Sequence, residues 1–128
     1  MILDSSAIVA ILVEEPGAEE LLSKLQATGP VGVGTPTLVE SHLVLAGRLQ
    51  TNPAPYLESF LLALDAVVLP FSDVHWYAAA DAFLRFGKGR HPAALNFGDC
   101  MAYATAKIAA QPLLCVGNDF PRTDLELA

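Results

Sequence analysis

The sequence has little cysteine, few basic residues and no long apolar run, and each shortage excludes a class of protein. Cys100 and Cys115 are the only cysteines and do not form a CxxC pair, so we expect buried thiols rather than a disulfide framework. Apolar runs such as AIVAILV at 7–13 are far shorter than the roughly 18 residues of a membrane span. The start MILD lacks the features of a signal peptide, so we expect no membrane partner and a cytoplasmic location.

Basic residues are outnumbered, with 7 Lys and Arg against 14 Asp and Glu and a formal net charge of -7. This balance excludes a protein that binds nucleic acid through its overall charge, so a polyanionic partner would need a local basic patch. Arg85, Lys88 and Arg90 lie within six positions of one another and are the first indication of such a patch.

Apolar material is plentiful. Hydrophobic residues make up 53% of the 128-residue chain, which predicts one globular domain over residues 1–128 with a substantial core. Short apolar segments alternate with helical ones, without hairpin signals, and this predicts a parallel sheet covered by helices on both faces. The expected strands are 1–3, 31–34, 66–71 and 113–116, and the expected helices are 5–17, 18–29, 35–49, 52–64, 72–86 and 99–110.

Several helix details follow from local patterns. A serine after Asp4 and Thr35 are expected as N-caps, with Pro36 in the first turn of its helix. In the helix 72–86, the spacing of Trp76, Ala79, Ala80 and Phe83 predicts a buried apolar stripe.

Four acids fall where a parallel sheet gathers its functional groups, at the carboxyl ends of strands and the helices that follow them. Asp4 closes the first expected strand, and Asp119 follows the last one by three residues. Asp99 starts the helix that leads into the last strand, and Glu40 lies in the helix after the second strand. These acids come from four separate parts of the chain and are expected to converge.

Glu40 is the least expected of the four. At about 100° per residue, Thr37, Ser41 and Arg48 are predicted to mark the solvent side of its helix, so that Glu40 points inward. An inward carboxylate is costly unless it is paired, for example with Arg48 or a backbone donor, or unless it coordinates a cation. Simpler interpretations also exist for Asp4 and Asp99 as helix caps, and for Asp119 and Asp124 as turn residues.

A divalent cation accounts for all four acids together, because converging carboxylates would otherwise repel one another. None of the histidines has metal-ligand spacing with another, and oxygen ligands suit Mg²⁺ or Mn²⁺ rather than zinc. Four carboxylates could hold either one ion or two. Such ions activate water for attack on a phosphodiester, so hydrolysis of a nucleic acid is the chemistry these residues favour.

Four motifs, in this order, cover nearly the whole chain: MILDSSAIVAIL, TPTLVES, GKGRHPAALNFGDCMAYATAK and GNDFPRTD. Together they resemble the PIN-domain ribonucleases and, within them, the VapC toxins of bacterial toxin-antitoxin pairs. The resemblance implies an α/β class, three-layer α/β/α fold with a mostly parallel central sheet. It also implies Mg²⁺-dependent cleavage of RNA, with Mn²⁺ as a possible substitute, a cognate VapB-type antitoxin and a homodimer.

The same resemblance implies roles for individual residues. Asp4 and Asp99 look like direct metal ligands, and Glu40 and Asp119 like acids that complete or orient the metal shell. Other positions match the surroundings of that site: Ser6 and Asn96 as hydrogen-bonding groups, Asp124 as the alternative to Asp119, and Arg85, Lys88 and Arg90 as contacts to the phosphates of RNA.

Two other functions were weighed against this one. A catalytically silent PIN-like module that only binds RNA or protein is the main alternative, and the intact set of four acids counts against it. A phosphoryl-transfer domain of the haloacid-phosphatase type would require DxD where this chain has DSS, at residues 4–6. The sequence does not specify the RNA target or the antitoxin.

Overall fold

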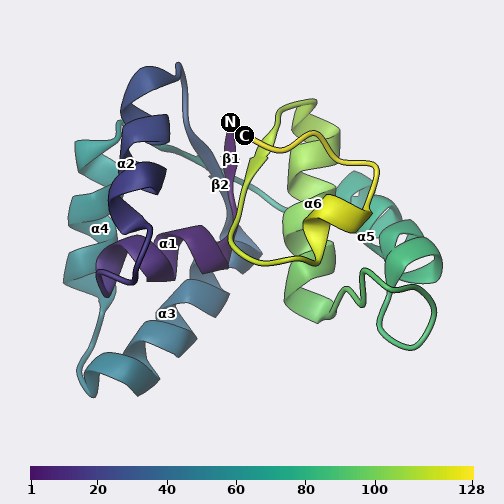
Figure 1. The fold of residues 1–128 in the computed structure, drawn as a ribbon, viewed down its shortest axis with the longest axis horizontal. Coiled ribbons are helices and arrows are strands. Elements are labelled where there is room, and N and C mark those ends of the chain that lie inside the picture. Colours follow the sequence, from purple (N-terminus) through teal and green to yellow (C-terminus); the bar gives the residue numbers. More distant parts are fainter.

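A parallel sheet lies between two layers of helices in the computed structural model, which describes residues 1–128 (Figure 1). The strand order is β3 (Val67–Leu69), β2 (Gly32–Gly34), β1 (Ile2–Leu3) and β4 (Leu113–Leu114). Ile2 pairs with Gly32 on one side and with Leu113 on the other. The predicted three-layer α/β/α arrangement with a parallel central sheet is therefore confirmed.

The helices divide unequally between the two faces of the sheet. Figure 1 shows one group formed by α1 (Ser5–Leu12), α2 (Ala18–Ala27), α3 (Thr35–Leu49) and α4 (Ala54–Ala63). On the other side lie α5 (Asp73–Phe86) and α6 (Phe97–Ala109), and a short 3-10 helix, η1 (Phe120–Arg122), follows β4. None of the helices combines the length and apolar character needed to cross a membrane.

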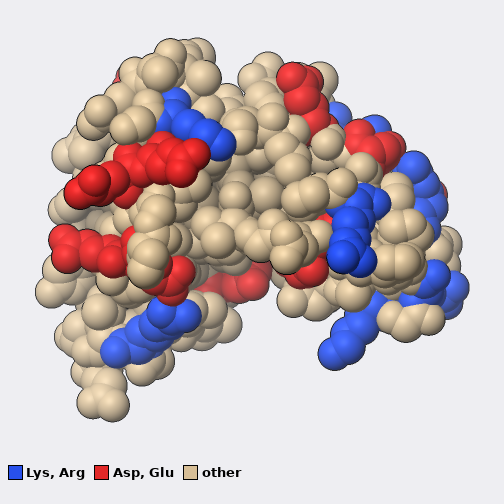
Figure 2. All heavy atoms as spheres, in the orientation of Figure 1, with Lys and Arg blue, Asp and Glu red and all other residues tan.

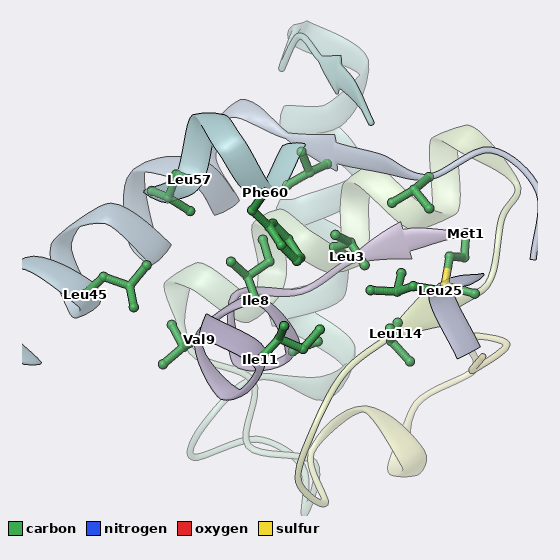
Figure 3. Packing of buried hydrophobic residues seen from close by; sticks show 13 residues of the cluster. Met1, Leu3, Ile8, Val9, Ile11, Leu25, Leu45, Leu57, Phe60 and Leu114 are labelled. Atoms are coloured by element: carbon green, nitrogen blue, oxygen red, sulfur yellow. The ribbon is translucent and has the colours of Figure 1, made fainter. Parts of the chain in front are cut away.

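Each helical layer buries its own hydrophobic cluster against the sheet. The cluster under α1–α4 is centred on residues such as Leu3, Ile8 and Leu45, all fully buried (Figure 3). The cluster under α5 and α6 contains Tyr103 and Leu113. Fully burying a large apolar side chain contributes about 1.5–3 kcal/mol, so these two clusters fix the strands whose ends carry the acids.

Strand and helix ends differ from the sequence prediction by a few residues. β3 and β4 are shorter than the expected 66–71 and 113–116. Asp4 itself, rather than a following serine, is the N-cap of α1, and Gly34 rather than Thr35 is the N-cap of α3. Asp4 and Gly34 both have the extended backbone of an N-cap residue. The N-cap of each of the two helices therefore lies earlier in the chain than the sequence pattern predicts.

The predicted apolar stripe of α5 exists, since its four residues line one apolar cleft, but of the four only Ala79 is buried. Trp76 is 61% exposed and Phe83 is 41% exposed, whereas Ala79 and Ala82 are buried. The small alanine side chains let α5 approach α6 closely, and this close packing turns the larger aromatic side chains away from the core. An uncovered aromatic surface on α5 is the consequence.

The predicted orientation of α3 is wrong for two of the three residues expected on its solvent side, whereas the third, Arg48, is exposed as expected. Thr37 and Ser41, expected on the solvent side, are buried, whereas Leu43 is 67% exposed. The Ser41 hydroxyl donates a 2.8 Å hydrogen bond to the carbonyl of Thr37 in its own helix. That bond satisfies the hydroxyl internally, so a small polar residue can be buried at low cost.

The strand order explains why distant acids meet. The chain passes from β1 to β2 and β3 in one direction and returns to place β4 on the other side of β1. In such sheets, a crevice forms at the carboxyl ends of the strands where the order reverses, here between β1 and β4. Asp4 directly follows β1 and Asp119 comes shortly after β4, so both belong to this crevice.

Candidate active site

The structure brings Asp4, Glu40, Asp99 and Asp119 to one place. The charge of Asp4 raises the pKa of both Glu40 and Asp99, and the charge of Asp119 raises the pKa of both Asp4 and Asp99. In the space-filling view, red carboxylate atoms lie in the recess between the two helical layers, and blue basic side chains stand on both sides of it (Figure 2). The fold therefore brings the four acids within electrostatic reach of one another.

Asp4 is the most buried of the four, with a relative exposure of 3%. Its Oδ2 accepts hydrogen bonds from the Ser6 amide at 3.0 Å and from the Ser6 hydroxyl at 2.5 Å. Its Oδ1 is buried and has no hydrogen-bond partner. Burial raises the pKa of Asp4, whereas the hydrogen bonds from Ser6 lower it. A buried carboxylate oxygen without a partner requires a cation or a hydrogen-bond donor.

Ser6 ties this carboxylate to the sheet. Besides donating to Asp4, its hydroxyl accepts a 2.9 Å hydrogen bond from the Val116 amide. Because Val116 follows β4 and Ser6 follows β1, the bond fixes the two strand ends relative to each other. Ser6 thus lies beside the acids, as expected.

Asp99 is the third residue of α6 rather than its cap. Asn96 is the N-cap: its Oδ1 accepts from the Asp99 amide at 2.9 Å, and its own amide donates to Asp99 Oδ2 at 2.9 Å. This reciprocal capping box uses only one oxygen of the Asp99 carboxylate. Burial, together with the charges of Asp4, Asp119 and Glu40, raises the pKa of Asp99 to about 6.

Glu40 is half-buried on α3 and lies directly against α6. Gly98 is the contact point, because a Cβ atom at this position would overlap with the Glu40 carboxylate. Burial raises the pKa of Glu40, the charge of Asp4 raises it further, and the Ser5 hydroxyl lowers it. The alternative partner, Arg48, instead forms a 2.7 Å ion pair with Glu15, so Arg48 does not neutralise Glu40.

Asp124 occupies a different environment from Asp119. Its carboxylate accepts from the Tyr103 hydroxyl at 2.7 Å, from Lys107 at 3.0 Å and from Arg85 at 3.2 Å. Burial acts to raise its pKa, but these three donors outweigh burial and hold the pKa of Asp124 well below its usual range. Arg85 also pairs with Asp81, so both Arg85 and Asp124 are engaged in an ionic network that joins the C-terminal segment to α5 and α6.

The remaining cations of the basic loop are free. Lys88 and Arg90 are exposed and form no ion pair, and the Arg90 guanidinium lies 5.4 Å from the centre of the Phe83 ring. Arg122, at the end of η1, is likewise exposed and unpaired, and sequence reasoning missed it. Its position three residues after Asp119 was the available signal.

Two further residues, Ser5 and Gly98, were also missed. Each acts on Glu40, which lies far from both in the sequence, so only the packing of α3 against α1 and α6 reveals them. The four carboxylates influence one another electrostatically, but no group of three or more His, Cys, Asp or Glu side chains is arranged closely enough to hold a metal ion.

Comparisons with known proteins show the family to which the chain belongs. The family model of the PIN domain matches residues 1–126. Ribonuclease VapC36 of Mycobacterium tuberculosis is 46% identical over 127 residues, covering 98% of this chain and 91% of the relative. The chain therefore belongs to the PIN-domain family and, within it, to the VapC ribonucleases.

Solved structures share the fold at much lower sequence identity. M. tuberculosis VapC20, described as a sarcin-ricin loop cleaving toxin, superimposes with a TM-score of 0.80 at 15% identity, over 99% of this chain and 97% of that one. VapBC2 from Rickettsia felis, bound to a DNA fragment from its promoter, gives a TM-score of 0.76 at 15% identity, over 99% and 96%.

Proposed function

We propose that this chain is a divalent-metal-dependent endoribonuclease, the toxin of a toxin-antitoxin pair, built as a single domain over residues 1–128. Its membership in the VapC ribonucleases supports RNA as the substrate. The observation that carries the metal dependence is the buried, unpartnered Oδ1 of Asp4, in a carboxylate that interacts electrostatically with those of Glu40, Asp99 and Asp119. An oxygen in that setting is poised to coordinate a cation.

The residues present fit such an ion. Asp4 and Asp99 each keep one oxygen free of the protein's own hydrogen bonds and would be its direct ligands. Glu40 and Asp119 would complete or orient the shell. A purely carboxylate set suits Mg²⁺, with Mn²⁺ able to substitute. When bound, the ion neutralises the carboxylates and promotes attack of water on a phosphodiester.

The chain's own residues prepare the site for that ion. Ser6 holds Asp4 in one rotamer through two hydrogen bonds, and Asn96 fixes Asp99 through the capping box. Glu40 is positioned by the Ser5 hydroxyl and by the backbone of α6 at Gly98, where the absence of a side chain leaves room for the Glu40 carboxylate. No group of three or more of these side chains is arranged to hold an ion by itself, so Asp4, Glu40, Asp99 and Asp119 would have to change rotamer to hold one together.

Phosphate binding has to come from local cations, because the chain carries a net charge of -7. Lys88, Arg90 and Arg122 are free of ion pairs and would contact the RNA backbone beside the acids. Arg85 is paired with Asp81 and Asp124. It would instead stabilise the packing of the C-terminal segment against α5. Phosphate contacts of this kind position the substrate without reading its sequence.

The partners follow from the same family membership. The Rickettsia felis neighbour is a VapBC assembly, and this supports a VapB-type antitoxin as the partner of this chain. We extend the proposal to a homodimer, since large apolar side chains on α3, among them Val39 and Leu43, stay uncovered in the single chain. A toxin that meets RNA and its antitoxin together would act in the cytoplasm.

Cleavage of labelled total RNA tests the function. Wild-type protein and Asp99→Asn are compared with Mg²⁺ and with excess EDTA, because the substitution removes charge while keeping shape. We expect discrete RNA fragments only from the wild-type protein, and only when Mg²⁺ is present. Equal cutting by Asp99→Asn would contradict the proposed site, whereas wild-type binding to RNA without cutting would support a silent binding module.

A further inference from the structure

An apolar cleft lies between α5 and α6, outside the set of carboxylates. Its volume is about 450 Å³ and every lining side chain is hydrophobic, among them Trp76, Phe83, Phe97 and Met101. We call it the α5–α6 cleft. Three of these four side chains are aromatic and largely exposed, so the cleft is an open surface rather than part of the core.

No packing or capping interaction in the fold explains why residue 97 is a phenylalanine. It is the first residue of α6 and is 81% exposed. The start of the helix is already capped by Asn96 and Asp99, and neither bond involves the Phe97 ring. An exposed phenyl ring in this position contributes nothing to the described fold, which points to a ligand.

The two ends of the cleft differ in chemistry. At one end, Phe97 lies in the first turn of α6, and the next residue, Gly98, lies against the Glu40 carboxylate. At the other, the Phe83 ring lies under the unpaired guanidinium of Arg90, 5.4 Å from the ring centre. A ligand that follows this path needs an apolar flat group beside a negative charge.

A nucleotide of single-stranded RNA has this combination. Its phosphate fits Arg90, and its base is a flat aromatic group of the kind that stacks on Phe, Tyr and Trp in RNA-binding proteins. The cleft offers no polar group to the base edges, so stacking area rather than hydrogen bonding would govern preference. Purines, with the larger ring system, are favoured.

We propose that the α5–α6 cleft is a nucleobase subsite, in which Phe97 stacks on the base of the substrate nucleotide adjacent to the phosphate that is cut. The inference rests on the proposed ribonuclease function and adds to it a base-binding surface next to the acids. Phe97 is in this sense a substrate-binding residue that acts on affinity rather than on the cutting step.

Binding to a non-cleaving protein tests the subsite. In an Asp99→Asn background with Mg²⁺, fluorescence anisotropy measures affinity for oligoadenylate about ten nucleotides long and for an abasic ribose-phosphate strand of the same length. The variants are Phe97→Ala, Phe97→Tyr and Leu62→Ala. Leu62, on α4, is 82% exposed and serves as the matched control for Phe97. Light scattering of each variant gives its oligomeric state.

We expect Phe97→Ala to weaken oligoadenylate binding about 5- to 100-fold, to leave the abasic strand unaffected, and to be rescued by Phe97→Tyr. Leu62→Ala should leave the affinity for both strands unchanged. An equal loss for both strands, or no loss, overturns the base subsite. If Phe97→Ala converts a dimer into a monomer, a second copy of the chain covers the cleft instead. If the unsubstituted background binds neither strand, the proposed phosphate contacts fail as well.

Discussion

Gly98 lies so close to Glu40 that its missing side chain is part of the site: a Cβ atom there would occupy the space of the Glu40 carboxylate. The first residues of α6 therefore form the wall against which an acid of α3 rests. Glu40 is held in place by this wall and by Ser5, and any atom added to the wall moves it.

Gly98→Ala should lower the cleavage rate at least about tenfold, because it displaces Glu40 from the other acids. Alanine favours a helix over glycine by about 1 kcal/mol, so unfolding is not the expected cause. Gly47→Ala is the matched control, since Gly47 also lies in a helix and no atom lies within 4 Å of the Cβ position there. Cleavage kinetics and thermal midpoints of both variants check this, and unchanged kinetics in Gly98→Ala would contradict the role given to Glu40.

Mg²⁺ should raise the thermal midpoint of the wild type at neutral pH, because the ion offsets repulsion among the four acids. Asp99→Asn should raise the midpoint in EDTA, since one of the repelling charges is gone, and should lose most of the Mg²⁺ effect. Differential scanning fluorimetry with a Mg²⁺ titration measures both. An equal Mg²⁺ shift in the two proteins would mean that the ion binds elsewhere.

Asp119→Asn and Asp124→Asn should have opposite consequences. The charge of Asp119 acts on Asp4 and Asp99, so its neutralisation should reduce cleavage with little loss of stability. Asp124 binds Tyr103, Lys107 and Arg85, so its neutralisation should destabilise the fold by about 1 kcal/mol after solvent screening. Cleavage assays and urea unfolding separate these effects, and the reverse pattern would make Asp124 the fourth acid of the site.

The Asp124 network also predicts a dependence on pH. Its pKa is lower in the folded chain than in the unfolded chain, so its stabilising contribution is complete above the usual carboxyl range. The contribution is then lost as pH falls through about 4 toward the folded-state pKa. The free energy of unfolding of Asp124→Asn should therefore fall less steeply than that of the wild type between about pH 5 and pH 3.

Arg122→Gln should weaken RNA binding and flatten its dependence on salt. Each phosphate contact to a single strand contributes a slope of about -0.7 in a plot of log affinity against log salt, and one such contact should be lost. Lys24→Gln is a suitable control, because Lys24 donates to the carbonyl of Ala128 at 3.1 Å. An unchanged slope in Arg122→Gln would show that this cation does not meet the RNA backbone.

The order of strands and helices and the convergence of the four acids could be predicted, because each depends on local patterns and on the geometry common to parallel sheets. Which side of α3 and of α5 is buried could not be predicted. Whether Thr37 or Leu43 is buried depends on which helices pack nearby, and the close approach of α5 to α6 through Ala79 and Ala82 is a long-range property.

The cap of α6 and the role of Arg85 were missed for related reasons. Asn96 and Asp99 both suit a helix start, and only the backbone angles show that Asn96 holds the cap position. Asp81, four residues before Arg85 in the same helix, is a partner that the sequence shows, whereas the second partner, Asp124, lies 39 positions away.

The dispersal of the acids along the chain has a consequence for biosynthesis. Asp4, Glu40 and Asp99 are made before the segment that supplies Asp119, and the strand β4 that positions it is added to the sheet late. A nascent chain that has not yet delivered this segment has no complete site. The proposed nuclease activity can therefore arise only after the newly made protein has folded.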